Sequence, residues 1–136
     1  MVDRNSDRTT ILIVDDSPES LDVLVTILKG DYRVKVAPNG KRALNLARSE
    51  PKPELILLDI LMPDMDGYEV CRQLKNDPIT AGIPVIFASA MESESDKEKG
   101  LQLGASDFVA KPYSAETVRD RVATQLEIKH DRDRRL

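Results

Sequence analysis

The stretch TILIVDDSP at residues 10–18 decides the fold of this chain. Its first five residues are mostly apolar and β-branched, which is typical of a strand buried on both faces of a parallel sheet. Asp15 and Asp16 follow this run, and Ser17-Pro18 then supplies an N-cap and a proline in the first helical turn. The stretch therefore predicts a buried strand that leads through an acidic pair into a helix.

The same succession of strand and helix continues along the chain. Apolar runs at residues 55–58, 84–88 and 107–110 predict three further strands. Residues 33–37 alternate with period two, which predicts a strand with one solvent-exposed face at an edge of the sheet. A helical pattern follows each strand. Five strands that alternate with five helices predict an α/β fold, a doubly wound five-stranded parallel sheet flanked by five helices.

Length and composition limit the classes of protein that need consideration. A chain of 136 residues fits one domain, and 40% hydrophobic and 32% charged residues are typical of a folded, soluble protein. The net charge of −4 gives no general affinity for nucleic acid or anionic membranes, and no apolar run reaches the roughly 18 residues that span a bilayer. A single cysteine excludes an internal disulfide. We expect a cytoplasmic protein without a nucleic-acid or membrane partner.

Five polar residues stand where the predicted buried strands end. They are Asp15, Asp16, Asp59, Ser89 and Lys111. In open parallel sheets, ligands bind outside the carboxyl ends of the strands, at the point where the strand order reverses. The five residues are therefore predicted to meet in one crevice.

The residue types in this crevice suit a metal ion and a phosphoryl group. Clustered carboxylates repel one another, and Mg²⁺ relieves the repulsion because it prefers oxygen ligands. A lysine and a serine hydroxyl can hold a phosphoryl oxygen, and a carboxylate can itself be the nucleophile that forms an aspartyl phosphate. Taken singly, the Asp15-Asp16 pair could equally be a helix cap, Lys111 a solvated loop residue and Ser89 a turn hydroxyl. Asp59 is different, because a carboxylate after a wholly apolar strand is costly unless it is paired or functional.

Four motifs in order resemble the receiver domain of two-component response regulators. They are ILIVDD at residues 11–16, LLDILMPDMDG at residues 57–67, Ser89-Ala90 and Lys111-Pro112. The resemblance extends over about residues 10–126. It implies the strand order 2-1-3-4-5, as in flavodoxin and CheY. We expect a polar segment at residues 1–9, a receiver domain at residues 10–128, and a polar tail or the start of a linker helix at residues 129–136.

The resemblance also assigns roles to individual residues. It implies that Asp59 is the phosphoacceptor, assisted by Lys111 and Ser89. It implies that Mg²⁺ is bound by three carboxylates and one backbone carbonyl, those of Asp15, Asp16, Asp59 and Leu61. Ser89 and Phe108 would form the switch that responds to phosphorylation, and the Lys111-Pro112 bond would be cis.

The implied function is a signalling module that is not itself an enzyme. Its partners would be a sensor histidine kinase or a phosphotransfer protein, and a downstream target protein or output domain, with a phosphorylation-dependent homodimer as a further expectation. The chain could be a stand-alone receiver or part of a larger regulator or hybrid kinase. Two alternatives stay open at this point. One is an aspartate-nucleophile phosphatase, although these usually carry a second acid where this chain has Leu61. The other is an interaction module that is independent of phosphorylation.

Overall fold

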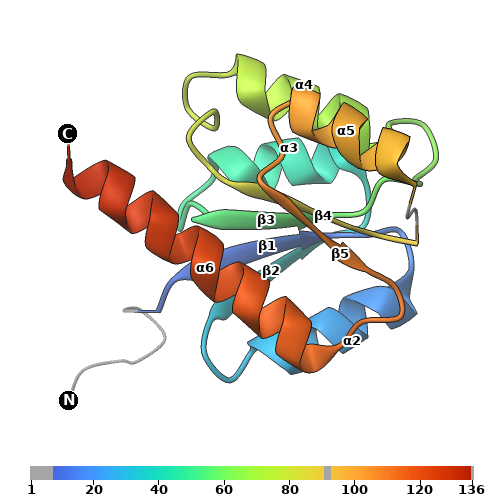
Figure 1. Cartoon of the computed structure of the whole chain (residues 1–136), viewed down its shortest axis with the longest axis horizontal. Helices are drawn as coiled ribbons and strands as arrows, with labels where there is room; N and C mark the ends of the chain where they lie inside the picture. The colour runs from blue at the N-terminus through green and yellow to red at the C-terminus, as the bar shows by residue number, and fades with distance from the viewer. Residues whose placement is uncertain (1–7, 91–92, 136) are drawn as a thin grey trace.

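Strands and helices alternate throughout the part of the chain that the computed structural model describes, residues 8–90 and 93–135 (Figure 1). In chain order the elements are β1 (Thr10–Val14), α2 (Pro18–Leu28), β2 (Arg33–Ala37), α3 (Gly40–Arg48), β3 (Leu55–Leu58), α4 (Gly67–Asn76), β4 (Val85–Ser89), α5 (Glu94–Gln102), β5 (Asp107–Ala110) and α6 (Ala115–Arg134). The predicted α/β fold is confirmed.

The five strands form one parallel sheet in the order β2-β1-β3-β4-β5. This is the order 2-1-3-4-5 that the sequence motifs imply, and β2 lies at an edge as its alternating pattern predicts. Helices α3, α4 and α5 cover one face of the sheet, and α2 and α6 cover the other (Figure 1). The chain reverses direction across the sheet between β1 and β3, so the switch point lies between these two strands.

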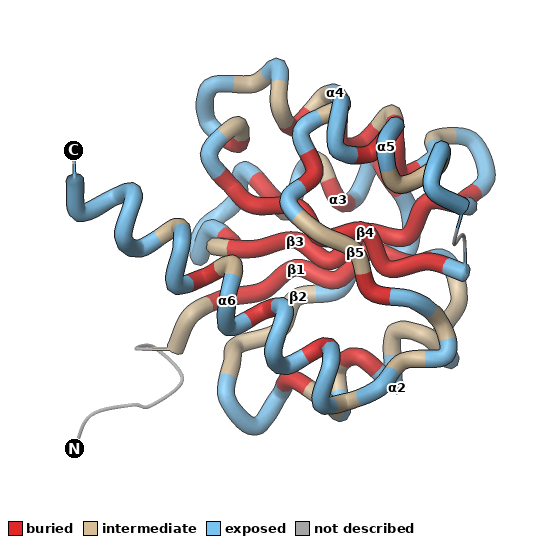
Figure 2. The backbone as a smooth tube through the Cα atoms, in the orientation of Figure 1, coloured by how far each residue is buried: buried red, intermediate tan, exposed pale blue. Residues whose placement is uncertain are grey.

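Two apolar clusters, one on each face of the sheet, form the core. Alternate residues of the same strand contribute to opposite clusters, as Leu12 and Ile13 do in β1. The central strands β1, β3 and β4 are buried along their whole length, whereas most of β2 is only partly buried (Figure 2). Packing on both faces therefore fixes the positions of the central strands, and with them the backbone positions of the residues that directly follow each strand.

A side chain caps the amino end of every helix in the described ranges. The capping residues are Ser17, Asn39, Asp66, Ser93 and Ser114, and each accepts a hydrogen bond from a backbone N–H in the first turn. These caps begin the helices directly after the loops that leave the carboxyl edge of the sheet. None of the described helices has the length and apolarity needed to cross a bilayer.

The last helix extends beyond the residues that pack on the sheet. α6 continues through Arg134, so residues 129–134 are helical, while most of the expected segment 1–9 lies outside the described residues. Arg132 Nη2 donates to the Gly82 carbonyl oxygen at 2.7 Å, and His130 Nε2 lies 3.1 Å from Glu54 Oε1. These contacts join the end of α6 to the loops before β3 and β4, at the edge of the sheet opposite the carboxyl ends.

Gly67 allows the first residue of α4 to lie against the backbone that follows β3. A Cβ atom at this position would stand 2.2 Å from the Asp59 carbonyl oxygen and 2.8 Å from Ile60 Cα. The Gly67 N–H donates to the Ile60 carbonyl oxygen at 2.8 Å. The absence of a side chain therefore sets the position of the loop that begins at Asp59.

We expect Gly67→Ala to lower the free energy of unfolding by about 1–3 kcal/mol, because the added methyl group meets backbone atoms that cannot move aside freely. Gly30→Ala is the matched control, since a Cβ atom there has nothing within 4 Å. It should be neutral or stabilising by up to about 1 kcal/mol. Urea denaturation of both variants measures the difference. Equal stabilities would contradict the close packing at Gly67.

Candidate functional site

The carboxyl ends of four neighbouring strands bring the predicted site residues together. Asp15 follows β1, Asp59 follows β3, Ser89 ends β4 and Lys111 follows β5. Backbone hydrogen bonds keep the ends of neighbouring strands side by side. The Asp59 N–H donates to the Val14 carbonyl oxygen at 2.9 Å, and the Lys111 N–H donates to the Ser89 carbonyl oxygen at 3.1 Å. The arrangement follows directly from the parallel register of the sheet.

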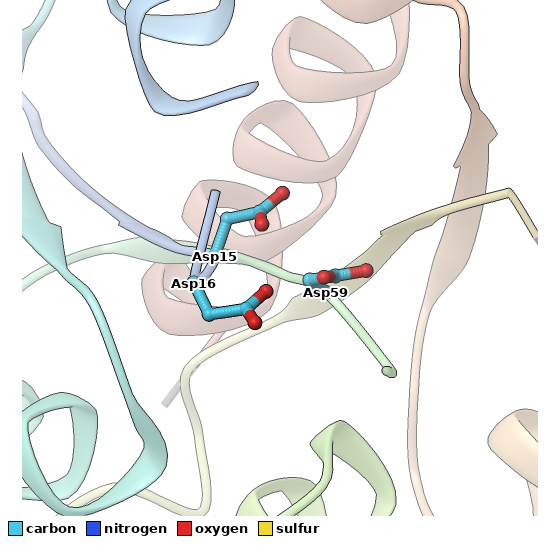
Figure 3. Close-up of side chains that lie close together, drawn as sticks. All are labelled: Asp15, Asp16 and Asp59. Carbon is cyan, nitrogen blue, oxygen red and sulfur yellow. The ribbon is translucent and has the colours of Figure 1, made fainter. Parts of the chain in front are cut away.

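Three carboxylates form the centre of the site (Figure 3). Asp15, Asp16 and Asp59 each offer an oxygen atom, and these atoms all lie within 4.8 Å of one another. Asp15 and Asp59 are buried, with 1% and 3% of their surface exposed, whereas Asp16 is exposed. The cluster therefore combines two desolvated acids with one that solvent reaches.

Backbone N–H groups and one lysine hold the two buried carboxylates. Asp15 Oδ1 accepts from the Ser17 N–H and Asp59 Oδ1 accepts from the Ile60 N–H, both at 2.9 Å. Lys111 Nζ lies 3.0 Å from Asp15 Oδ2 and 3.7 Å from Asp59 Oδ2. A single ammonium group thus bridges the two acids that end neighbouring strands.

The charge balance of this group leaves negative charge in excess. Burial, and then the neighbouring carboxylate of Asp15, raise the pKa of Asp59 to about 6, although Lys111 opposes the change. Among the described side chains, Asp15 Oδ2 is buried without a hydrogen bond, its close neighbour being the Lys111 ammonium. One lysine does not compensate three acids.

The donor set fits a hard divalent cation. Three carboxylates supply oxygen ligands, and Asp15 Oδ2 has unused hydrogen-bonding capacity. A second positive group would also offset the repulsion that raises the pKa of Asp59. The three carboxylates could therefore bind a metal ion. Leu61, the fourth residue that the resemblance implies, lies two residues after Asp59 with its side chain turned to solvent, 63% exposed.

The two residues expected to form a switch lie on the same face of the sheet. In the β4–β5 register, Ser89 is opposite Ala110 and Phe87 is opposite Phe108. Ser89 is buried, and Phe108 is partly buried with its ring centroid 5.7 Å from that of Phe87. A Cβ atom on Gly100 of α5 would stand 2.8 Å from each of the two rings. Packed side chains thus connect the region of Ser89 to helix α5.

Tyr113 is a further residue at the site that the sequence motifs do not single out. Its hydroxyl donates to the Ala88 carbonyl oxygen at 3.3 Å. Burial raises its pKa, and the carboxylates of Asp15 and Asp59 raise it further, so the hydroxyl stays protonated. Only its place two residues after Lys111 could have drawn attention to it. The intervening Lys111-Pro112 bond is cis.

Comparisons with known proteins agree with this geometry. The family model described as "Response regulator receiver domain" matches residues 11–123. Protein PilH of Pseudomonas aeruginosa is 43% identical over 109 residues, which cover 79% of this chain and 89% of that protein. A probable cyclic di-GMP phosphodiesterase of Vibrio cholerae is 45% identical over 126 residues, 93% of this chain but only 28% of that protein. A CheY-like receiver domain protein of Methanospirillum hungatei JF-1 superposes with a TM-score of 0.84 at 26% identity, covering 92% of this chain and 98% of that structure.

The doubly wound sheet with an acidic group at its switch point defines an α/β domain whose ligand site lies at the carboxyl ends of the strands. This chain belongs to the response regulator receiver domain family. It is a phosphoacceptor module of two-component signalling. The phosphatase alternative gains no support, because the exposed Leu61 stands where a second acid would be needed.

The raised pKa of Asp59 predicts a measurable effect of pH on stability. The folded protein holds this proton more tightly than the unfolded chain, where an aspartate has a pKa near 3.8. The tighter binding of this proton stabilises the folded state. This contribution to the free energy of unfolding is complete below about pH 4 and is lost as the pH rises through about 6. In EDTA, Asp59→Asn should therefore be more stable than the wild type by on the order of 1–3 kcal/mol at neutral pH, and the advantage should shrink toward zero in acid.

Chemical denaturation at a series of pH values measures this difference. Addition of Mg²⁺ at neutral pH is the control, since a cation that binds the folded wild type should reduce the advantage of the variant. A stability difference that did not change with pH would contradict the electrostatic explanation.

Proposed function

We propose that Asp59 accepts a phosphoryl group from a phosphohistidine of a sensor histidine kinase or a phosphotransfer protein. The observation that carries this proposal is the position of Asp59, a buried carboxylate at the switch point beside two other acids and 3.7 Å from Lys111 Nζ. Structural roles alone give little reason to bury such a carboxylate after an apolar strand, because burial of a carboxylate is costly. A reaction at the Asp59 carboxylate would explain why it is buried there.

The transfer requires little covalent chemistry from the rest of the protein. An Asp59 carboxylate oxygen attacks phosphorus, the phosphorus–nitrogen bond breaks, and the bonding electrons leave with the imidazole, which takes up a proton. Lys111 then offers its ammonium group to a phosphoryl oxygen, and the Ser89 hydroxyl offers a hydrogen bond to another. Such transfer depends mainly on positioning and on charge neutralisation.

Mg²⁺ is the cofactor that suits this site. Asp15, Asp16 and Asp59 would hold it through carboxylate oxygens, and Leu61 through its backbone carbonyl. When bound, the ion neutralises charge on the phosphoryl oxygens. Asp16 is the most accessible of the three acids, so solvent-borne Mg²⁺ can reach the site through it.

Phosphorylation would change the surface around α5, β5 and α6. A phosphoryl group adds about −1.5 to −2 charges and three acceptor oxygens at Asp59. Movement of Ser89 toward these oxygens would free space on the face that Phe87 and Phe108 share. Phe108 can turn inward without needing a hydrogen-bond partner there, because its ring carries no hydroxyl. The surface so changed would bind a downstream protein target, an output domain or a second receiver.

The proposed function also concerns the cellular compartment of the domain and whether the domain turns over a substrate. We infer a cytoplasmic signalling role in which the domain is phosphorylated but does not turn over a substrate of its own. The receiver at residues 10–128 could act alone or within a larger regulator or hybrid kinase.

Acetyl phosphate with Mg²⁺ tests the assignment of the acceptor. The wild type should gain the mass of one phosphoryl group, and Asp59→Asn should gain none, because an amide is not nucleophilic enough to form the acyl phosphate. Intact-mass spectrometry measures both, and circular dichroism shows that the variant is folded. Undiminished labelling of Asp59→Asn would place the acceptor elsewhere.

Asp16→Ala is the companion variant for the metal role. It retains the acceptor but loses one oxygen ligand, so half-maximal labelling should need a higher Mg²⁺ concentration while saturating Mg²⁺ restores much of the yield. An unchanged Mg²⁺ requirement would remove Asp16 from the metal site.

The switch is tested by amide NMR with beryllium fluoride and Mg²⁺, which together imitate the phosphorylated state. Resonances of Phe108 and α5 should shift along with those of the loops around Asp15 and Asp59, because a population shift needs different contacts in the two states. Asp59→Asn should show no such response. Shifts confined to the loops in the wild type would exclude transmission through Phe108.

A further inference from the structure

Tyr113 lies in the short loop that carries Lys111 from β5 to α6. β5 ends at Ala110, and the side chain of Ser114 already caps α6, so residues 111–113 form the whole connection between them. The Tyr113 hydroxyl donates to the Ala88 carbonyl oxygen of β4 at 3.3 Å. The β3–β4 ladder ends at Leu58 and Phe87, one residue before Ala88. The hydroxyl therefore bonds to β4 just beyond its pairing with β3.

A second bond attaches the other end of the same loop to the next residue of β4. The Lys111 N–H donates to the Ser89 carbonyl oxygen at 3.1 Å. Two successive carbonyls of one central strand thus hold the two ends of residues 111–113. The Tyr113 ring also packs against the apolar cluster between the sheet and helices α2 and α6. The loop is fixed by hydrogen bonds on one side and by packing on the other.

This attachment matters because of what the Lys111 side chain does. Its Nζ lies 3.0 Å from Asp15 Oδ2 and 3.7 Å from Asp59 Oδ2, at the end of a flexible four-carbon stem. A quarter of the side chain is exposed, so solvent can compete for the ammonium group. Confining the backbone on both sides of the lysine reduces the number of positions that the ammonium can occupy.

We propose that Tyr113 is a positioning residue for phosphoryl transfer, whose hydroxyl holds the Lys111 loop on β4 so that the ammonium group faces Asp15 and Asp59. The inference rests on the proposed role of Asp59 as acceptor. It adds a residue that acts through Lys111 and does not touch the phosphoryl group.

Tyr113→Phe removes only the hydroxyl and is the first test. Phosphorylation by acetyl phosphate at saturating Mg²⁺ should become about two- to tenfold slower, the range expected when one net hydrogen bond no longer holds the reactive geometry. Tyr68→Phe is the matched control, because the Tyr68 hydroxyl donates to the Asp96 carbonyl oxygen at the same distance, 3.3 Å, but lies between α4 and α5. Its rate should equal that of the wild type. A Tyr113→Phe rate equal to the wild-type rate would overturn the proposal.

A double-mutant cycle with Lys111→Ala separates positioning from a general structural role. If Tyr113 acts through Lys111, Tyr113→Phe should have no further effect on the rate in the Lys111→Ala background. The same fold-loss in both backgrounds would overturn the proposal. NMR relaxation of the Lys111 Cε–Hε group provides a readout that needs no phosphorylation: the group should become more mobile in Tyr113→Phe, and unchanged mobility would contradict the positioning role.

These outcomes differ from those of a failed acceptor assignment. A wild-type protein that acetyl phosphate does not label would refute the proposed chemistry at Asp59, whatever the relaxation of Lys111 shows. A labelled wild type with an unaffected Tyr113→Phe variant would refute only the role of Tyr113.

Discussion

The repulsion between buried carboxylates at the carboxyl edge of the sheet is the interaction around which this domain is organised. Asp15 and Asp59 end adjacent strands with almost no exposed surface, and one lysine shared between them leaves the acids in excess. Burial first, and then the repulsion from Asp15, raise the pKa of Asp59. Any positive ion or phosphoryl group that enters therefore changes a balance that is already unfavourable, which makes the site sensitive to both.

The rest of the fold keeps these charges close together in spite of their repulsion. The strands that carry them lie between two apolar clusters, so they cannot separate without exposing core side chains. Gly67 places the start of α4 against the backbone after Asp59, and the side chain of Ser17 caps the helix that follows Asp15 and Asp16. Packing energy from the whole domain thus maintains an arrangement that isolated loops would not keep.

Local patterns in the sequence were sufficient to predict the strands and helices and to predict which residues lie together at most of the candidate site. Apolar runs identify the buried strands, and the rule for parallel sheets then brings Asp15, Asp59 and Lys111 together before any coordinates are known. Contacts between distant segments were not predictable in this way. Tyr113 bonds to a backbone carbonyl 25 residues away, and His130 contacts Glu54 across 76 residues. Neither contact leaves a periodic or spacing signal, because the partner is a backbone atom in one case and a half-buried acid before β3 in the other.

The two ends of the parallel strands carry different features of the domain. At the amino ends of the strands, Arg132 donates a hydrogen bond to the Gly82 carbonyl oxygen and holds the extension of α6 on the loop before β4. At the carboxyl ends of the strands, the end of β4 is bonded to the loop of Lys111, whose ammonium group lies between Asp15 and Asp59. β4 also carries Phe87, whose ring lies between those of Tyr68 and Phe108 and close to Gly100 of α5. Packed side chains on β4 and β5 therefore lie between the sheet and α5 on this face. Under the proposed phosphorylation of Asp59, these close-packed rings would have to move together, which would favour two distinct arrangements over a gradual response.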